Sequence, residues 1–212
     1  MRLHDYPASG NCYKVRLALT QLEIPFERVE VNIFDGGTLT DEFGALNPAR
    51  TTPVLETDAG DVLVESNAIL VYLTDGTELM PADPVERAQA LRWLFYEQAN
   101  IVPSIGSLRV RVAAGLIEPG KLGGRGFAGA AALQLLDDHL RERSFLVGER
   151  YTVADLCTYA YVHVAGEAGL DLAGYPAVGA WIERVEATPR HMDDLAPIPS
   201  DTQLGVGRSI YG

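Results

Sequence analysis

The sequence contains few cysteines and few basic residues, and each shortage argues against a class of protein. Its 212 residues include only 2 cysteines, Cys12 and Cys157, far apart in the chain. A disulfide-stabilised secreted domain needs more of them, so a reducing compartment is favoured. The chain has 17 lysines and arginines against 29 aspartates and glutamates, which gives a net charge of −12. Because this charge repels nucleic acids and anionic membranes, we expect binding to neither.

Long apolar runs are also missing. The longest uninterrupted one, Ala68–Leu73, is far too short to cross a bilayer. The opening residues, MRLHDYPASG, lack the apolar segment of a signal peptide. The 4 histidines show no metal-ligand spacing. These features predict a soluble cytoplasmic protein with no metal site and no resident cofactor.

What the chain does contain is the composition of a globular protein, with 47% hydrophobic and 22% charged residues. Its first third alternates strand and helix signals in the order β-α-β-α-β-β-α. This order predicts a parallel crossover unit followed by an antiparallel hairpin. The expected elements are a strand at 2–6, a helix ending near Leu22, a strand at 26–33, a short helix before Pro48, a hairpin around Ala59-Gly60 and a helix from Ser66 to Gly76.

Beyond a polar, proline-containing linker at residues 77–84, almost no strand signal remains. The fold class expected is therefore an α/β domain at 1–76 followed by an all-helical domain at 85–212. The tail from residue 200 shows no periodicity and is assigned no structure. The expected helices run from Val85 to about Gly115 with a kink at Pro103, from a glycine-rich connector at 118–129 to near Ser144, from the capping box Thr152–Asp155 onward, and over 175–187 and 190–195.

Several short segments follow one another in an order that resembles a known family. PASGNC (7–12) lies at the first strand-to-helix turn, and NPARTTPVL (47–55) precedes the hairpin. ESNAI (65–69) opens a helix, and GERYTVADL (148–156) contains the capping box. Together they resemble the cytosolic glutathione S-transferases of theta-like and nu-like bacterial type, over nearly all of the chain. The resemblance implies a thioredoxin-like amino-terminal domain and a helical-bundle domain that lines a second-substrate site.

The resemblance also implies residues that bind glutathione. Ser66 opens a helix whose N-terminus suits a carboxylate, and Glu65 can take an ammonium, so this pair is expected to hold the γ-glutamyl end. Pro53 is expected to follow a cis peptide bond, and the backbone of Thr52 to pair with the cysteinyl unit. Arg50 either binds the glycine carboxylate or is a solvated loop charge, and both interpretations stay open.

Ser9, Asn11 and Cys12 compete for the chemical role in the opening segment. The nucleophile of this family is the thiolate of glutathione, and a hydroxyl or amide donor lowers the pKa of that thiol. Ser9 is the preferred donor, with Asn11 as the alternative. Cys12 either packs in the core or acts as a redox nucleophile, and packing is preferred.

Tyr96, Asn100, Ser104 and Leu108 recur at helical spacing and resemble the second-substrate wall of the family; a core or dimer face is the alternative. The resemblance predicts a homodimeric transferase with glutathione as co-substrate and a small apolar electrophile as its partner. A glutathione-dependent disulfide or peroxide reductase is the first alternative. A non-catalytic glutathione-binding or scaffold protein of the same fold is the second.

Overall fold

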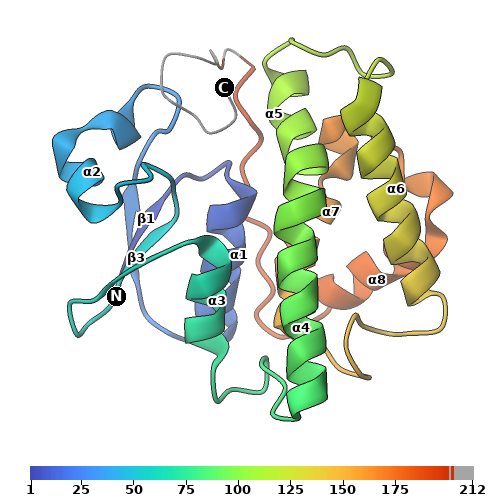
Figure 1. The fold of residues 1–212 in the computed structure, drawn as a ribbon, viewed down its shortest axis with the longest axis horizontal. Helices are drawn as coiled ribbons and strands as arrows, with labels where there is room; N and C mark the ends of the chain where they lie inside the picture. Colours follow the sequence, from blue (N-terminus) through green and yellow to red (C-terminus); the bar gives the residue numbers. More distant parts are fainter. Residues whose placement is uncertain (201, 203–212) are drawn as a thin grey trace. The chain divides into compact units, whose positions relative to one another are not determined.

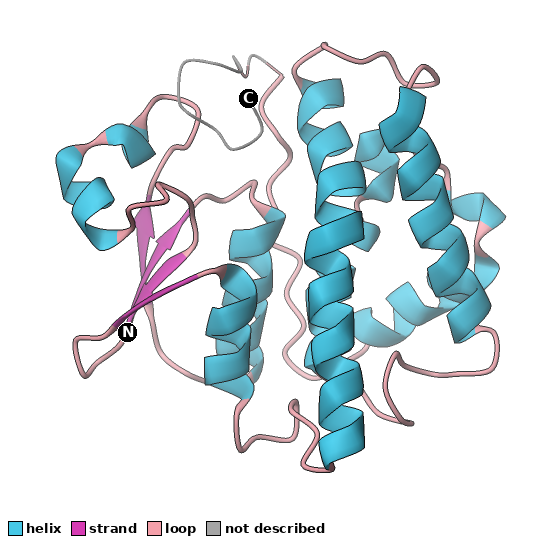
Figure 2. Ribbon diagram, in the orientation of Figure 1, coloured by secondary structure: helices cyan, strands magenta, loops and turns pink. Residues whose placement is uncertain are grey.

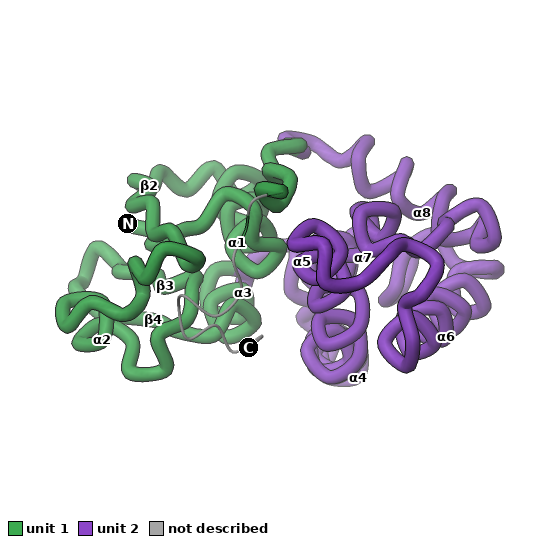
Figure 3. Tube along the Cα trace, turned by 90° about the horizontal axis from the view of Figure 1, so that it is seen from above, with its two compact units in different colours: residues 1–73, 192–212 green, residues 74–191 purple. Residues whose placement is uncertain are grey.

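The computed structural model describes residues 1–200 and 202, which form two compact units (Figure 3). The first contains Met1–Leu73 and the chain from Met192 onward, and the second contains Thr74–His191. The sequence analysis placed residues 192–200 in the helical domain. The structure instead groups them with the amino-terminal unit, where Asp194 pairs with the buried Arg16 at 3.0 Å.

The first unit is built on a four-stranded sheet with the strand order β2-β1-β3-β4. β1 pairs in parallel with β2 and antiparallel with β3, which pairs antiparallel with β4. The predicted crossover unit and hairpin are thereby confirmed. α1 and α3 lie side by side on one side of the sheet and α2 on the other (Figure 1). The elements are β1 (Arg2–Asp5), α1 (Gly10–Gln21), β2 (Glu27–Glu30), a 3-10 turn at Gly37–Leu39, α2 (Asp41–Leu46), β3 (Val54–Glu56), β4 (Val62–Val64) and α3 (Ser66–Thr74).

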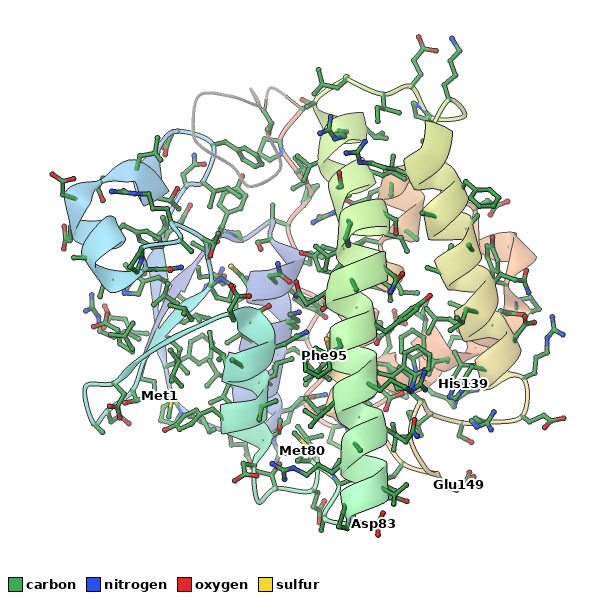
Figure 4. All side chains as sticks on the ribbon, in the orientation of Figure 1. Met1, Met80, Asp83, Phe95, His139 and Glu149 are labelled. Atoms are coloured by element: carbon green, nitrogen blue, oxygen red, sulfur yellow. The ribbon has the colours of Figure 1, made fainter. Side chains whose placement is uncertain are left out.

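The second unit is helical in its regular elements (Figure 2). α4 begins after Asp83, whose carboxylate accepts hydrogen bonds from the N–H groups of Val85 at 2.9 Å and Glu86 at 3.0 Å (Figure 4 labels Asp83). The helices are α4 (Pro84–Tyr96), the π-helix η2 (Glu97–Gly106), α5 (Ser107–Ala113), α6 (Gly123–Leu140), α7 (Val153–Val162) and α8 (Pro176–Glu186), with short 3-10 turns at Ala165–Ala168 and Leu172–Gly174.

The long helix expected from Val85 runs through α4, η2 and α5, and its irregularity lies at the predicted proline. Pro103 has no N–H group to donate within a helix, and the turns around it are π-helical over Glu97–Gly106. The backbone hydrogen-bond pattern of this stretch therefore differs from that of the α-helices on either side. Two of the candidate wall residues, Asn100 and Ser104, lie within it.

Two expected elements differ from the structure. Gly123–Phe127, assigned to a loop, form the first turns of α6. Close packing is found further along the same helix, where a Cβ on Gly129 would lie 2.7 Å from Leu170. The helix expected at 190–195 is absent, and Met192 and Asp194 of this segment instead bond to Tyr13 and Arg16 of α1. Most of the unassigned tail, residues 201 and 203–212, lies outside the described residues.

Within residues 1–200 and 202, no helix is both long enough and apolar enough to span a bilayer. Nor do three or more histidine, cysteine, aspartate or glutamate side chains gather in this part of the chain as a metal ion would require.

Candidate active site

Ser9 lies at the N-cap of α1, directly after the turn that ends β1. Pro7 terminates the strand, and the N–H of Ser9 donates to the carbonyl of Tyr6 at 2.9 Å. The Oγ of Ser9 accepts a hydrogen bond from the N–H of Cys12 at 3.3 Å. A hydroxyl has two lone pairs and one proton, so this capping bond does not use the proton, which can be donated to the Cys12 sulfur or to a ligand. Ser9 can therefore cap the helix and donate to a ligand at the same time.

Cys12 is fully buried beneath this turn, and the N–H of Tyr6 donates to its Sγ at 3.4 Å. Burial, with the nearby charge of Asp5, raises the pKa of the Cys12 thiol to about 11. Hydrogen bonds from the Ser9 and Thr52 side chains lower this pKa but are outweighed. The predicted packing role of Cys12 is confirmed by its burial. The same contacts show that Ser9 and Thr52, from separate loops, meet around one sulfur atom.

Both cysteines are expected to resist alkylation in the folded protein, because Cys12 and Cys157 are each 0% exposed. Iodoacetamide at pH 8 should modify them about 100-fold more slowly than it does in urea, where both thiols are free to react. Mass spectrometry of peptides from timed samples measures the two rates separately. Rapid modification of Cys12 in the folded state would instead support the redox interpretation of this residue.

The loop before β3 carries the predicted cis peptide bond. The Thr52–Pro53 peptide is cis, as expected, and Thr52 is half-buried. The buried Asn47 holds this loop: its Nδ2 donates to the carbonyl of Thr51 at 2.8 Å, and its Oδ1 accepts from the N–H of Ala49 at 3.0 Å. Sequence reasoning missed the role of Asn47. The signal was present, because an asparagine before proline commonly bonds to backbone groups a few residues on.

Arg50 braces the same loop against the residues around the start of α2. Its Nη1 donates to the carbonyls of Thr38 at 3.0 Å and Thr40 at 2.8 Å. Gly44 leaves room for this arrangement, since a Cβ there would lie 2.5 Å from Nη2 of Arg50. The guanidinium is thus bonded to protein carbonyls rather than held only by water. Its role at the glycine carboxylate stays a prediction.

The N-terminus of α3 meets the opening segment of α1. Ser66, the first residue of α3, is buried, and its Oγ donates to Oδ1 of Asn11 at 3.3 Å. One turn further along α1, Nζ of Lys14 donates to Oδ1 of Asn67 at 2.7 Å. Two segments far apart in sequence are thus brought together by hydrogen bonds between their side chains.

Glu65, directly before α3, is exposed and has a φ of 68°. This left-handed conformation is uncommon for a residue with a side chain, and such residues cluster at ligand-binding sites. The exposed carboxylate beside a helix N-terminus places a negative group next to a site that favours anions. The pair can accept a molecule that carries both an ammonium and a carboxylate.

The four candidate wall residues do not form one uniform stripe. Tyr96 is half-buried and Asn100 is exposed, whereas Ser104 and Leu108 are 2% and 0% exposed. The Oγ of Ser104 donates to the carbonyl of Asn100 within the π-helix. The four side chains thus differ in exposure and do not present one uniform surface. Their contact with an apolar co-substrate stays a prediction.

Comparison with known families is decisive. Residues 3–79 match the family described as "Glutathione S-transferase, N-terminal domain", and residues 128–189 match "Glutathione S-transferase, C-terminal domain". The chain belongs to the glutathione S-transferase family. Its thioredoxin-like first unit and helical second unit are the fold of that family, as the resemblance implied.

Individual relatives of this glutathione S-transferase family member span nearly the whole chain. It is 30% identical over 212 residues to the disulfide-bond oxidoreductase YfcG of Escherichia coli (strain K12), covering 96% of this chain and 97% of that protein. A glutathione S-transferase of Pseudomonas fluorescens Pf-5 superposes with a TM-score of 0.86 at 42% identity, covering 92% of this chain and 98% of the other. A glutathione transferase of Burkholderia graminis was solved with two glutathione molecules per subunit; it shows a TM-score of 0.77 and 27% identity, covering 89% of this chain and 84% of the other.

Proposed function

We propose that this member of the glutathione S-transferase family is a glutathione transferase that activates the thiol of bound glutathione for attack on an apolar electrophile. The observation that carries the proposal is the position of Ser9. Its hydroxyl caps α1 through an oxygen lone pair, so the cap does not use its proton, and it lies with Thr52 close to Cys12. A donor at the N-terminus of a helix stabilises an anion through both its own proton and the helix dipole.

In this proposal glutathione binds along the first unit as an extended peptide. Its γ-glutamyl carboxylate lies at Ser66 on the N-terminus of α3, and its ammonium pairs with Glu65. Its cysteinyl unit pairs with the backbone of Thr52 before the cis Pro53, as an added strand does. Arg50 is the candidate for the glycine carboxylate. These contacts leave the sulfur near Ser9.

The chemistry needs one proton removed and one bond exchanged. A thiol of pKa about 8.5 is mostly protonated at neutral pH, and the thiolate is the nucleophile. A charge-assisted hydrogen bond from Ser9 is worth roughly 1.5–3 kcal/mol, equivalent to about one to two pKa units. The thiol proton passes to solvent, the sulfur forms a bond to the electrophilic carbon, and the leaving group departs with its electron pair. This route uses no metal and no covalent bond to the protein.

Ser9→Ala is expected to raise the pKa of the bound glutathione thiol by about one to two units, with a roughly 10- to 100-fold fall in kcat/KM for an aryl halide near pH 6.5. The ultraviolet absorbance of the thiolate, titrated in the complex, measures the pKa directly. Asn11→Ala should shift it less, and Cys12→Ala should leave it unchanged. A larger shift in Asn11→Ala would reverse the choice of donor. If none of the three variants raises the pKa, the mechanism is wrong.

A glutathione-dependent disulfide reductase is the second candidate, favoured by the similarity to the Escherichia coli disulfide-bond oxidoreductase. Parallel assays with a small aryl halide and a small dialkyl disulfide separate the two reactions. Conjugation that exceeds disulfide reduction supports the transferase. Retention on immobilised glutathione without thiolate formation would instead indicate a binding protein.

A further inference from the structure

The carboxy-terminal segment Met192–Ile198, called the strap below, is hydrogen-bonded to the turn that carries Ser9. The N–H of Ala196 donates to the carbonyl of Pro7 at 3.2 Å. At the start of the strap, the hydroxyl of Tyr13 on α1 donates to the carbonyl of Met192 at 2.7 Å. These contacts lie within the first unit. The strap therefore belongs to the surroundings of the candidate active site.

The buried side chain of Arg16 forms hydrogen bonds both to the strap and to the turn that carries Ser9. This side chain is fully buried, and its Nη2 donates to the carbonyl of Pro7 at 3.2 Å. The guanidinium is oriented by two carboxylates: Nη1 donates to Asp5 at 2.6 Å, and Nε donates to both oxygens of Asp194 at 3.0 and 3.1 Å. Nη2 also donates to Asp194 at 3.0 Å. A planar guanidinium held at both ends has little freedom to leave the carbonyl.

The carbonyl of Pro7 is a sensitive point in this turn. Tyr6–Ser9 forms a β-turn closed by the bond from the N–H of Ser9 to the carbonyl of Tyr6. β-turn types differ in the orientation of their middle peptide, here Pro7–Ala8, while the closing bond can be the same. Two donors on the Pro7 carbonyl, one from Arg16 and one from Ala196, hold that peptide in one orientation. The direction in which the chain enters Ser9 is set by this orientation.

We propose that Asp194 is a positioning residue for thiolate formation, acting through Arg16 and the carbonyl of Pro7 on the hydroxyl of Ser9. This inference rests on the proposed function, since Ser9 must be the donor to sulfur. Asp194 does not itself touch glutathione. Its carboxylate keeps the guanidinium aligned and the strap in place, so that Ser9 is preorganised instead of sampling several orientations.

Asp194→Ala is expected to raise the pKa of the bound glutathione thiol by about 0.5–1 unit and to lower kcat about three- to tenfold. KM for glutathione should stay within about twofold, because the proposed contacts at Thr52, Glu65 and Ser66 are intact. Arg28→Ala is the matched control. Arg28 bonds to the carboxylates of Asp5 at 2.6 Å and Asp194 at 3.3 Å, but no contact joins it to Pro7. That variant should lose stability without a change in thiol pKa.

Two further measurements keep the outcomes distinct. Asp194→Asn keeps one acceptor oxygen, should show a smaller shift, and replaces the alanine variant if the latter unfolds. Hydrogen exchange of the Ser9 amide should become about tenfold faster in the Asp194 variants and not in Arg28→Ala, whether or not glutathione is present.

An unchanged thiol pKa in both Asp194 variants, with a raised one in Ser9→Ala, would overturn this inference and leave the proposed function standing. An unchanged thiol pKa in Ser9→Ala would remove the proposed donor, and this inference with it. Equal pKa shifts in Asp194→Ala and Arg28→Ala would reduce the role of Asp194 to general stability and so contradict the inference.

Discussion

Asp155→Ala is expected to lower the free energy of unfolding of the second unit by about 3–5 kcal/mol. The Asp155 carboxylate is fully buried and accepts hydrogen bonds at both ends. Oδ2 accepts from the N–H and hydroxyl of Thr152 at 2.9 and 3.1 Å, completing the capping box of α7. Oδ1 accepts from the N–H of Leu146 at 2.8 Å and from Nε1 of Trp181 at 3.0 Å. Truncation to alanine leaves several buried donors without an acceptor. Denaturant titration followed by far-ultraviolet circular dichroism measures the loss of free energy of unfolding.

Asp83→Ala is the matched control, because Asp83 caps α4 with the same kind of bond but is exposed. Water can replace an exposed cap, so its loss should cost only about 1 kcal/mol. Similar losses in the two variants would mean that the bonds from Leu146 and Trp181 add nothing to the cap of α7. That result would contradict the role assigned to the buried carboxylate.

The same carboxylate makes a testable contribution to pH dependence. Burial raises the pKa of Asp155 from 3.8 to about 6, against the opposing effect of its hydrogen bonds. The folded state then binds this proton more tightly than the unfolded state, so the stability contributed is fully present below about pH 4 and is lost as pH rises through 6. Relative to Asp155→Asn, which cannot titrate, the native protein should lose about 1 kcal/mol between pH 5 and pH 7. A difference that stays constant over this range would contradict the raised pKa and show that the hydrogen bonds outweigh burial.

Arg16→Ala is expected to destabilise the first unit by about 2–3 kcal/mol, since it removes the buried partner of Asp5 and leaves that carboxylate with the more exposed Arg28 as its remaining cation. Asp5 is 1% exposed and loses its partner at 2.6 Å, and Asp194 loses a bidentate one. Arg16→Lys should recover only part of the loss, because an ammonium cannot span two carboxylates and a carbonyl with fixed geometry. Urea titration of each variant measures the change.

Arg28 provides the comparison for Arg16, because its side chain is 41% exposed and pairs with the same two carboxylates. Solvent screens this pair, so Arg28→Ala should cost about 1 kcal/mol or less. Equal costs for the two arginines would indicate that burial of Arg16 does not decide its contribution. The stability of the network would then have to be assigned to Asp5 and the backbone contacts.

Much of the fold could be predicted from local patterns. The alternation in β2, the glycine of the β3–β4 hairpin and the capping box at Thr152–Asp155 are each signals contained in a few residues. The helix over Gly123–Phe127 could not be predicted, since propensity alone places glycines in a loop. The π-helix around Pro103 was predicted only as a kink, because the way in which a helix accommodates a proline depends on its neighbours.

The candidate site likewise contains some residues that short motifs predict and others that only the structure reveals. Ser9, the cis Pro53 and the start of α3 at Ser66 follow from short motifs. Asn47 was missed although its position before Pro48 is a local signal for side-chain bonds to nearby backbone groups. The four candidate wall residues from Tyr96 to Leu108 share a regular spacing in the sequence, but their different exposures depend on the surrounding packing.

By itself the sequence determined the order of the elements, the segments that resemble glutathione S-transferases, and the opening turn with its candidate donor. Each of these depends on residues close together in the chain. Only the tertiary structure decided that Asn11 faces Ser66, that Arg16 is buried between Asp5 and Asp194, and that the strap bonds to the turn of Ser9. Such contacts join residues more than a hundred positions apart in some cases, and no periodicity records them. The sequence does not distinguish a buried charged residue from an exposed one, because burial and loss of hydration depend on how the side chain packs in the folded protein.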